Sequence, residues 1–244
     1  MARDPILVRR KPPRGVVLLE HETFDVLDQV SPAGAGVEAG EVSSHVQGEA
    51  LRRPDGKVPA YTSLIEAAQQ ARGKLTFCAE NEDDTPLVEG YQTLFAAARC
   101  LRGELGDVSS AALHIIDRRT HLRAFWACVL SLCVPANVAV DPSSPDPFAK
   151  LRGAVEVLRC EVVVASREVA GRLEGIFRDD VRVVDVDAAM VRAERTTRRG
   201  LDATAGPGDA AYAQLTSGST GRPKCILETH GAIIFHIRSS AQQA

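Results

Sequence analysis

From Tyr61 onward the sequence alternates short apolar runs with segments of helical periodicity, and this alternation limits the possible folds more than any other feature. Strand-length apolar runs lie at 75–79, 111–116, 134–140, 162–165, 181–186 and 210–216. Strands that alternate with helices of about ten residues predict βαβ units. Because these runs are mainly apolar rather than alternating, they predict strands that are buried on both faces. We therefore expect an α/β fold, a mostly parallel sheet with helices on both faces.

The helical segments follow from apolar periodicity and from residues that favour helix ends. Ser63 and Glu66 have the spacing of a capping box, which predicts a helix start there, and Gly73 can end that helix. The segment 122–133 is apolar nearly all round, so we expect a helix that is buried on several sides. Further helices are expected at 91–105, 148–158 and 168–177, and another from near Gly231.

Residues 1–58 are rich in Pro and Gly and have weak periodicity. We expect a poorly ordered leader or linker there, with one short strand at 16–19, followed by an incomplete folded domain over 59–244. A second stretch, with arginines at 192, 195, 198 and 199, is interrupted by Glu194 and is followed by a Gly/Pro segment. We interpret it as a solvated linker rather than a nucleic-acid-binding patch.

Composition excludes several classes of protein. Hydrophobic residues make up 45% and charged residues 25% of the chain, which is enough apolar surface to build a core. The formal net charge of −3 provides no positive field for nucleic acid or an anionic membrane. The six cysteines form no CxxC pair. No apolar run reaches the ~18 residues of a membrane span. The first residues lack a signal sequence. We expect a cytoplasmic protein with neither a nucleic-acid partner nor a membrane span.

The strongest chemical signal is the segment 216–224, Thr-Ser-Gly-Ser-Thr-Gly-Arg-Pro-Lys, on a loop between strand candidates at 210–216 and 225–227. Glycines let the backbone approach a ligand closely, and backbone N–H groups with hydroxyls and a lysine suit an oligophosphate. A charged hydrogen bond contributes roughly 1.5–3 kcal/mol, so we expect the lysine to contribute most. The predicted contacts are Thr216, Ser217, Gly218, Ser219, Thr220, Gly221 and Lys224.

Two other interpretations of this loop are open. A flexible Ser/Gly surface loop needs no ligand. A Walker P-loop would have Gly-Lys-Ser/Thr followed by a helix, whereas here Pro223 precedes the lysine, Cys225 follows it and a strand comes next. The order of residues therefore disfavours a P-loop NTPase.

The loop resembles the phosphate-binding loop of the acyl-adenylate-forming (AMP-binding) superfamily, which includes acyl-CoA synthetases, nonribosomal peptide synthetase adenylation domains and fatty acyl-AMP ligases. The resemblance continues through Thr229-His230 and, upstream, through 124–130, 134–135 and 140–142. It is greatest to acyl-loading modules of polyketide and peptide assembly lines. Cys225 stands where the family usually has Gly, and it is either a tolerated small residue or a reactive thiol.

The resemblance implies that ATP activates a carboxylic acid as an acyl-adenylate, with Mg²⁺ bound to the ATP phosphates. CoA or the phosphopantetheine of a carrier protein would then accept the acyl group. We expect neither a catalytic side chain nor a protein-held metal, because this chemistry depends on positioning and charge stabilisation. The family's adenine, ribose and lid segments have no counterpart here. We therefore expect a truncated N-terminal portion that is inactive alone; the alternative is an inactive remnant with at most weak nucleotide binding. The sequence does not name the acid.

The histidines leave alternatives open. His230 matches the family's Thr-His, so it either lies near the acyl site or begins a helix with its hydrogen bond satisfied. His236 is expected in the core or at its rim. His114 and His121 have no acidic or cysteine partner at metal-ligand spacing.

Overall fold

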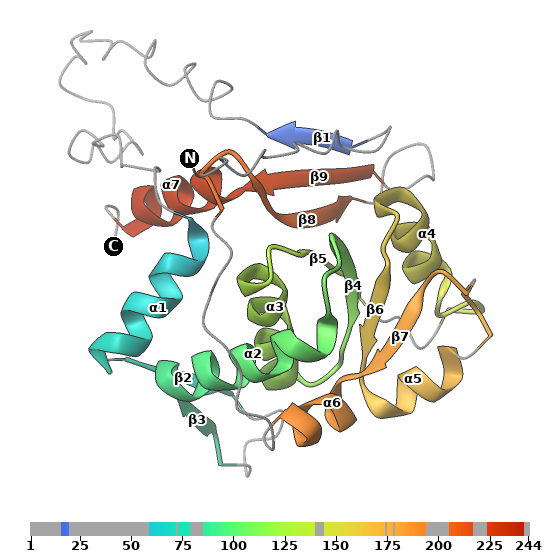
Figure 1. Ribbon diagram of the computed structural model, residues 1–244, viewed down its shortest axis with the longest axis horizontal. Helices are drawn as coiled ribbons and strands as arrows, with labels where there is room; N and C mark the ends of the chain where they lie inside the picture. The colour runs from blue at the N-terminus through green and yellow to red at the C-terminus, as the bar shows by residue number, and fades with distance from the viewer. Residues whose placement is uncertain are drawn as a thin grey trace, which may run out of the picture.

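The computed structural model describes residues 16–19, 59–71, 73–78, 85–139, 144–173, 175–177, 179–193, 205–216 and 224–241. In this part of the chain, strands form a seven-stranded sheet in the order β1-β9-β8-β5-β4-β6-β7 and a separate pair, β2-β3 (Figure 1). The strands are β1 (Val16–Leu19), β2 (Lys74–Phe77), β3 (Leu87–Gly90), β4 (Ser110–His114), β5 (Val134–Asn137), β6 (Val162–Ala165), β7 (Arg182–Asp185), β8 (Ala210–Thr216) and β9 (Lys224–Thr229). The helices are α1 (Ala60–Gln70), α2 (Tyr91–Leu105), α3 (Arg118–Leu130), α4 (Ala149–Leu158), α5 (Arg167–Leu173), α6 (Val186–Ala193) and α7 (His230–Ala241).

The central strands of the large sheet all run in one direction. β4 pairs in parallel with both β5 and β6, and β6 pairs in parallel with β7. β8 joins β5 in parallel, whereas β9 pairs antiparallel with β8. The expected mostly parallel α/β sheet is therefore confirmed.

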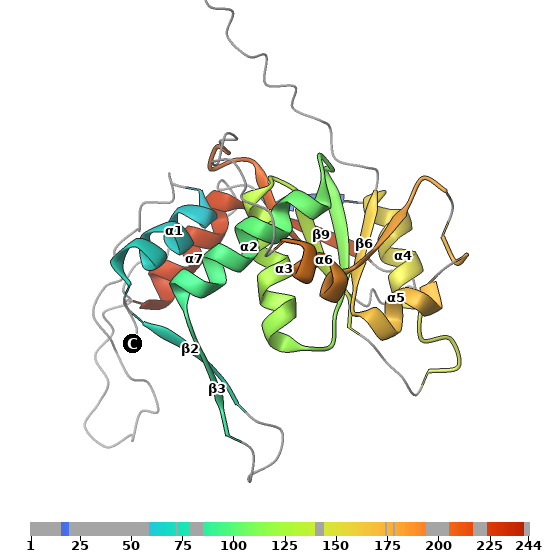
Figure 2. The ribbon, with the colours of Figure 1, turned by 60° about the horizontal axis from the view of Figure 1, so that its bottom comes forward.

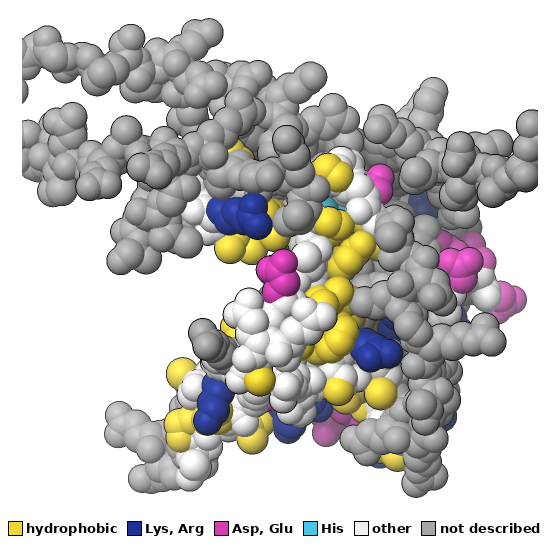
Figure 3. Space-filling view, turned by 60° about the vertical axis from the view of Figure 1, so that its left-hand side comes forward, with side chains coloured by type: hydrophobic (Ala, Val, Ile, Leu, Met, Phe, Trp, Pro, Cys, Tyr) yellow, Lys and Arg dark blue, Asp and Glu magenta, His cyan; other side chains and the backbone are white. Residues whose placement is uncertain are grey.

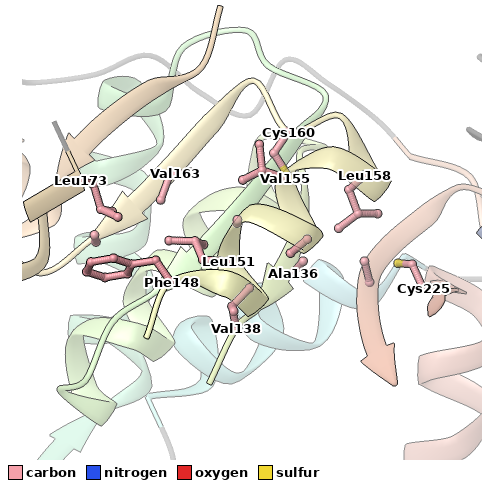
Figure 4. Close-up of a cluster of buried hydrophobic side chains, with 14 of the residues drawn as sticks. Ala136, Val138, Phe148, Leu151, Val155, Leu158, Cys160, Val163, Leu173 and Cys225 are labelled. Atoms are coloured by element: carbon pink, nitrogen blue, oxygen red, sulfur yellow. The ribbon is translucent and has the colours of Figure 1, made fainter. Parts of the chain in front are cut away.

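Helices cover both faces of the central strands, as the apolar runs predict. Figure 2 shows α4 and α5 on one side of β6, and α2, α3 and α6 on the other. Along β6, Val163 and Ala165 belong to the core beneath α4 and α5, while Val162 and Val164 belong to the opposite core. Figure 4 shows the first of these cores, in which Val163 lies with side chains from α4 and α5. This alternation is the period-two geometry of a strand that is buried on both faces.

The start of α1 differs from the capping-box expectation. The helix begins at Ala60, and the hydroxyl of Ser63 donates to the carbonyl of Ala60 at 2.7 Å instead of capping the helix. Ser63 therefore lies inside the first turn. The N–H of Ala60 is instead bound by the ring of His230, which is 170 positions away in the sequence. The ring of His230, at the start of α7, therefore accepts a hydrogen bond at the start of α1, where the side chain of Ser63 was expected to act as the cap.

Three further elements depart from the expectations. α3 begins at Arg118 rather than at 122, because the Asp117 carboxylate accepts the backbone N–H of Thr120 at 2.7 Å and caps the helix. β3 was not expected. Neither was α6, which begins where the Asp185 carboxylate accepts two backbone N–H groups. Arg192, expected in a solvated linker, lies in α6 and pairs with Glu104 at 3.0 Å.

The strand expected at 16–19 is present as β1, which pairs in parallel with β9. The expectation of a poorly ordered leader over the rest of 1–58 concerns residues outside the described part, and so do positions 195, 198 and 199 of the arginine-rich stretch. These expectations stay predictions. Within the described part, no helix has the length and apolar character to cross a bilayer.

A buried ion-pair cluster, formed by Glu89, Arg119 and Arg123, joins the small β2-β3 sheet to helix α3. Glu89 on β3 is 4% exposed, and Arg123 on α3 binds its carboxylate at 3.0 Å. Arg119, one turn earlier on α3, also donates to Glu89. A buried carboxylate needs such partners, because burial removes the water that would otherwise solvate its charge.

We expect Glu89→Ala to lower the free energy of unfolding by about 3 kcal/mol, because it leaves the mostly buried Arg123 without its counter-ion. Urea denaturation measures this loss. The control is Asp146→Ala, which removes one partner of the exposed pair Asp146–Arg152 and should leave stability nearly unchanged. Equal effects of the two substitutions would contradict the role given to the Glu89 cluster.

Candidate functional site

The predicted phosphate loop connects two antiparallel strands. β8 ends at Thr216 and β9 begins at Lys224, and these two residues are register partners. The location of the motif on a loop between strands is thus as expected. The residues between them, which include Ser217, Gly218, Ser219, Thr220 and Gly221, lie outside the described part of the chain, as does the side chain of Lys224. Their contacts with phosphate stay a prediction.

The direction of β8 determines the edge of the sheet at which this loop lies. β8 is parallel to β5, with Ala213 opposite Ala136, and β5 is parallel to β4. Thr216 therefore lies at the carboxyl edge of the parallel strands, the edge that also carries His114 at the end of β4. Open α/β sheets bind their ligands at this edge. The sheet thus presents the loop where α/β enzymes bind small molecules.

Cys225, the departure from the family pattern, is a core residue. Its side chain is fully buried, and burial raises the pKa of the thiol to about 11. At neutral pH the sulfur is therefore protonated and a poor nucleophile. The structure favours the tolerated small residue over the reactive thiol.

His230 lies at the opposite edge of the sheet from the phosphate loop. β9 runs from Lys224 to Thr229, and at about 3.4 Å per residue it places His230 roughly 20 Å from Lys224. The ring is 1% exposed, and its Nδ1 accepts the N–H of Ala60 at 3.2 Å. Of the two interpretations of His230, the structure supports the helix-start histidine with a satisfied hydrogen bond.

The other histidines have separate environments. His236 is exposed on α7, so it lies at the rim rather than in the core. His121 contacts Asn137 at the end of β5, with Nε2 3.0 Å from Oδ1. His114 is fully buried at the end of β4. Among the residues that the structure describes, no group of three or more His, Cys, Asp or Glu side chains could hold a metal ion.

A cavity of about 660 Å³ also lies at the carboxyl edge, lined in part by residues that follow β4, β6 and β7. Most of its charged groups already have protein partners. Arg119 binds Glu89, and Arg167 binds Asp185 at 3.2 Å. Burial alone would raise the pKa of Asp117, but hydrogen bonds from Thr120 outweigh it and hold this pKa below its usual value. This cavity is therefore built largely from helix caps and ion pairs.

On the face that Figure 3 shows, the charged side chains of the described residues are dispersed. Figure 3 shows the face that comes forward from the left-hand side of Figure 1, and there the basic side chains of the described residues appear as separate groups among hydrophobic and neutral ones. This arrangement agrees with the small net charge of the chain.

Comparison with known proteins identifies the family. The model of the family described as "AMP-binding enzyme" matches residues 89–244, which is more than half of the chain. The chain belongs to the AMP-binding enzyme family. The match includes the whole predicted phosphate loop and the strands on either side of it.

Several relatives of this chain are peptide synthetases. It is 35% identical over 120 residues to D-lysergyl-peptide-synthetase subunit 2 of Epichloe festucae var. lolii, a match that covers 46% of the chain and 8% of that protein. It is 30% identical over 109 residues to the nonribosomal peptide synthetase easA of Emericella nidulans, covering 44% of the chain and 2% of that protein. The chain thus spans a small part of the length of each relative.

A solved structure shares the fold. The adenylation domain of a keto acid-selecting nonribosomal peptide synthetase module, bound to keto acyl adenylate, superposes with a TM-score of 0.63 at 26% identity. The match covers 80% of this chain and 36% of that one. Relationship to adenylation domains of peptide synthetases is therefore supported by both sequence and fold.

The buried His230 predicts a pH dependence of stability. Burial lowers the pKa of His230 to about 4, from a usual value of 6.5. As pH falls through this window, the unfolded chain binds a proton that folded His230 does not, so the free energy of unfolding should fall by up to about 3 kcal/mol. Urea unfolding between about pH 4.5 and 7.5 measures the slope.

His230→Asn offers an amide oxygen to Ala60 and does not titrate, so it should flatten this slope. The matched control is His236→Asn, which replaces an exposed histidine on the same helix and should keep the wild-type slope. A slope that is the same in both variants would contradict the assignment to His230.

Thiol reactivity tests the environment of Cys225. We expect an aromatic disulfide reagent to react first with Cys78, which is exposed, while native Cys225 stays protected by burial. Accordingly, Cys78→Ser should remove the fastest phase and Cys225→Ser should leave it unchanged. Loss of that phase in Cys225→Ser would show an accessible thiol beside the phosphate loop.

Proposed function

We propose that this chain holds the β- and γ-phosphates of ATP during activation of a carboxylic acid to an acyl-adenylate, as part of a peptide-synthetase type of adenylating enzyme. One observation carries the proposal. The loop of seven predicted phosphate contacts begins and ends at the carboxyl edge of a parallel sheet, where Thr216 pairs with Lys224. This is the edge at which α/β enzymes bind nucleotides.

The residues of the loop fit a triphosphate by their chemistry. Backbone N–H groups at Gly218 and Gly221 can approach phosphate oxygens closely, since no side chain intervenes. The hydroxyls of Ser217, Ser219 and Thr220 are further donors. Mg²⁺ bound to the ATP phosphates would offset part of their negative charge. In this proposal the loop aligns the pyrophosphate leaving group, and Lys224 stabilises the charge that develops on it.

The relatives support a proposal for the acyl donor, and the acceptor is proposed from the family resemblance. The relatives are peptide synthetases, and the adenylation domain with the same fold holds a keto acyl adenylate. A carboxylic acid is therefore the proposed acyl donor. The phosphopantetheine of a carrier protein, or CoA, is the proposed acceptor. The family's adenine and lid motifs have no counterpart in these 244 residues, so the complete reaction requires further segments.

Binding of MgATP tests the proposal directly. We expect the 244-residue chain to bind MgATP weakly and saturably in titration calorimetry. Lys224→Ala should weaken binding at least about tenfold, because a charged hydrogen bond contributes roughly 1.5–3 kcal/mol. The matched control is Lys150→Ala, an exposed lysine on α4, which should bind as the wild type does. Unchanged binding in Lys224→Ala would remove this lysine from the phosphate site.

A second measurement tests whether these 244 residues are sufficient for the reaction. The chain alone should catalyse no carboxylate-dependent ATP–pyrophosphate exchange, since the motifs for adenine and the lid are absent from its sequence. Exchange with any acid would contradict the need for further segments. Absence of any saturable MgATP binding would favour the inactive α/β module instead.

A further inference from the structure

We propose that Cys128 and Cys133 form an intramolecular disulfide when a small disulfide, such as oxidised glutathione, reacts with the protein. The bond would fasten the end of helix α3 to the start of strand β5, which begins at Val134. Both cysteines are free in this structure. The inference concerns the redox chemistry of the fold, so it goes beyond the proposed adenylating function and does not depend on it.

The backbone at the end of α3 brings the two cysteines together. Leu132 adopts a left-handed conformation, with a φ of 57°, and the chain leaves the helix there. The N–H of Leu132 donates to the carbonyl of Val129 at 3.2 Å, and the N–H of Cys133 donates to the carbonyl of Cys128 at 3.0 Å. These two bonds define a Schellman motif, in which the side chains at the two ends of the longer bond are often in contact. Here both of those side chains are thiols.

The two side chains also interact directly. The thiols of Cys133 and Cys128 are hydrogen-bonded to each other, and this bond together with burial raises the pKa of Cys133 well above its usual value. Cys128 is 0% exposed and Cys133 is 1% exposed, and both belong to the core beneath α2, α3 and α6. The packing of that core therefore holds the two sulfur atoms next to each other.

Burial determines how oxidation can occur. A protonated, buried thiol is a poor nucleophile, so the reaction requires opening of the end of α3, and local opening costs less free energy than global unfolding. In the opened segment, one cysteine thiolate attacks a sulfur of oxidised glutathione and releases glutathione thiolate. The second cysteine then attacks the mixed disulfide and releases the other glutathione. Two protein thiols and one oxidised glutathione thus give one protein disulfide and two molecules of reduced glutathione.

Cys160 is the main competitor for Cys133. Burial raises the pKa of Cys160 to about 12, and Cys133 lies near enough to contribute to this shift. However, Cys160 belongs to the core on the other face of the sheet, and its thiol is hydrogen-bonded with Ser110. Cys225 also belongs to that other core. The location of Cys128 and Cys133 on the same face therefore favours their pairing.

Peptide mapping of the wild-type chain tests the inference. Cleavage by trypsin after Arg123 and Lys150 yields one peptide that contains Cys128, Cys133 and no other cysteine. The chain is equilibrated with glutathione buffers of increasing oxidised fraction in a low, non-denaturing concentration of urea, quenched with acid, and then unfolded and labelled with a maleimide. As the buffer becomes oxidising, this peptide should lose both maleimide labels and two hydrogen atoms.

The same titration in concentrated urea separates the effect of the fold from the effect of short spacing. Cysteines that are close in sequence also pair in an unfolded chain, but there no core holds the sulfur atoms together. The folded chain should reach half-oxidation at a glutathione ratio at least about tenfold less oxidising than the unfolded chain requires. By linkage, the oxidised chain should unfold at a higher urea concentration than the reduced chain.

Two buried cysteines provide matched variants. Cys160→Ala should keep both the disulfide and the greater resistance of the oxidised chain to urea. Cys133→Ala should lose both, because Cys128 then lacks the thiol to which it is hydrogen-bonded. If Cys133→Ala fails to fold, the comparison of the folded and unfolded wild-type chain still decides.

Each of three results would overturn the proposal. Persistence of both maleimide labels in the folded chain, at ratios that oxidise the unfolded chain, would show that native packing opposes the bond. Equal ratios for the folded and unfolded chains would show that the fold does not bring the sulfur atoms together. A crosslink from Cys133 to Cys160 would assign the disulfide to a different pair.

Discussion

Burial of β4 on both faces is the constraint from which the rest of the architecture follows. Ala111 and Leu113 point into the core beneath α2, α3 and α6, while Ala112 points into the core beneath α4. All three are 0% exposed. A strand enclosed in this way cannot carry polar chemistry along its length, because an unpaired polar group would lose its hydration. Polar side chains are therefore confined to the two ends of the strand.

The two edges of the sheet consequently carry different groups of polar residues. At the amino edge, His230 binds the backbone of Ala60 and fastens α1 to α7, a purely structural contact. The carboxyl edge gathers the end of β8, the caps of α3 and α6, and the buried ring of His114. The predicted phosphate loop and His114 share this edge but not the same strands, since β5 lies between β8 and β4. At about 4.8 Å per strand, the ends of β8 and β4 are roughly 10 Å apart.

Local sequence predicted the elements whose stability is mainly local or uniformly hydrophobic. The helix at Tyr91–Leu105 and the strands at Val162–Ala165 and Ala210–Thr216 have the expected bounds. One element that it missed, β3, depends on distant partners. β3 contains Glu89, which reads as a surface residue until two arginines of α3 bind it. The starts of α3 and α6 did have local signals, in the capping carboxylates of Asp117 and Asp185.

The sequence by itself determined the parallel α/β class and the position of a glycine- and hydroxyl-rich loop between two strands, because both depend on patterns within a few residues. Only the tertiary structure decided the edge on which each group lies. The direction of β8 is set by its pairing with β5, far away along the chain, and this puts Lys224 at the carboxyl edge and His230 at the other. For the same reason, His114 is buried only after the segments that contain Val138 and Phe148 have packed against it. Hydrogen bonding and burial between distant segments are properties of the folded chain, which periodicity cannot encode.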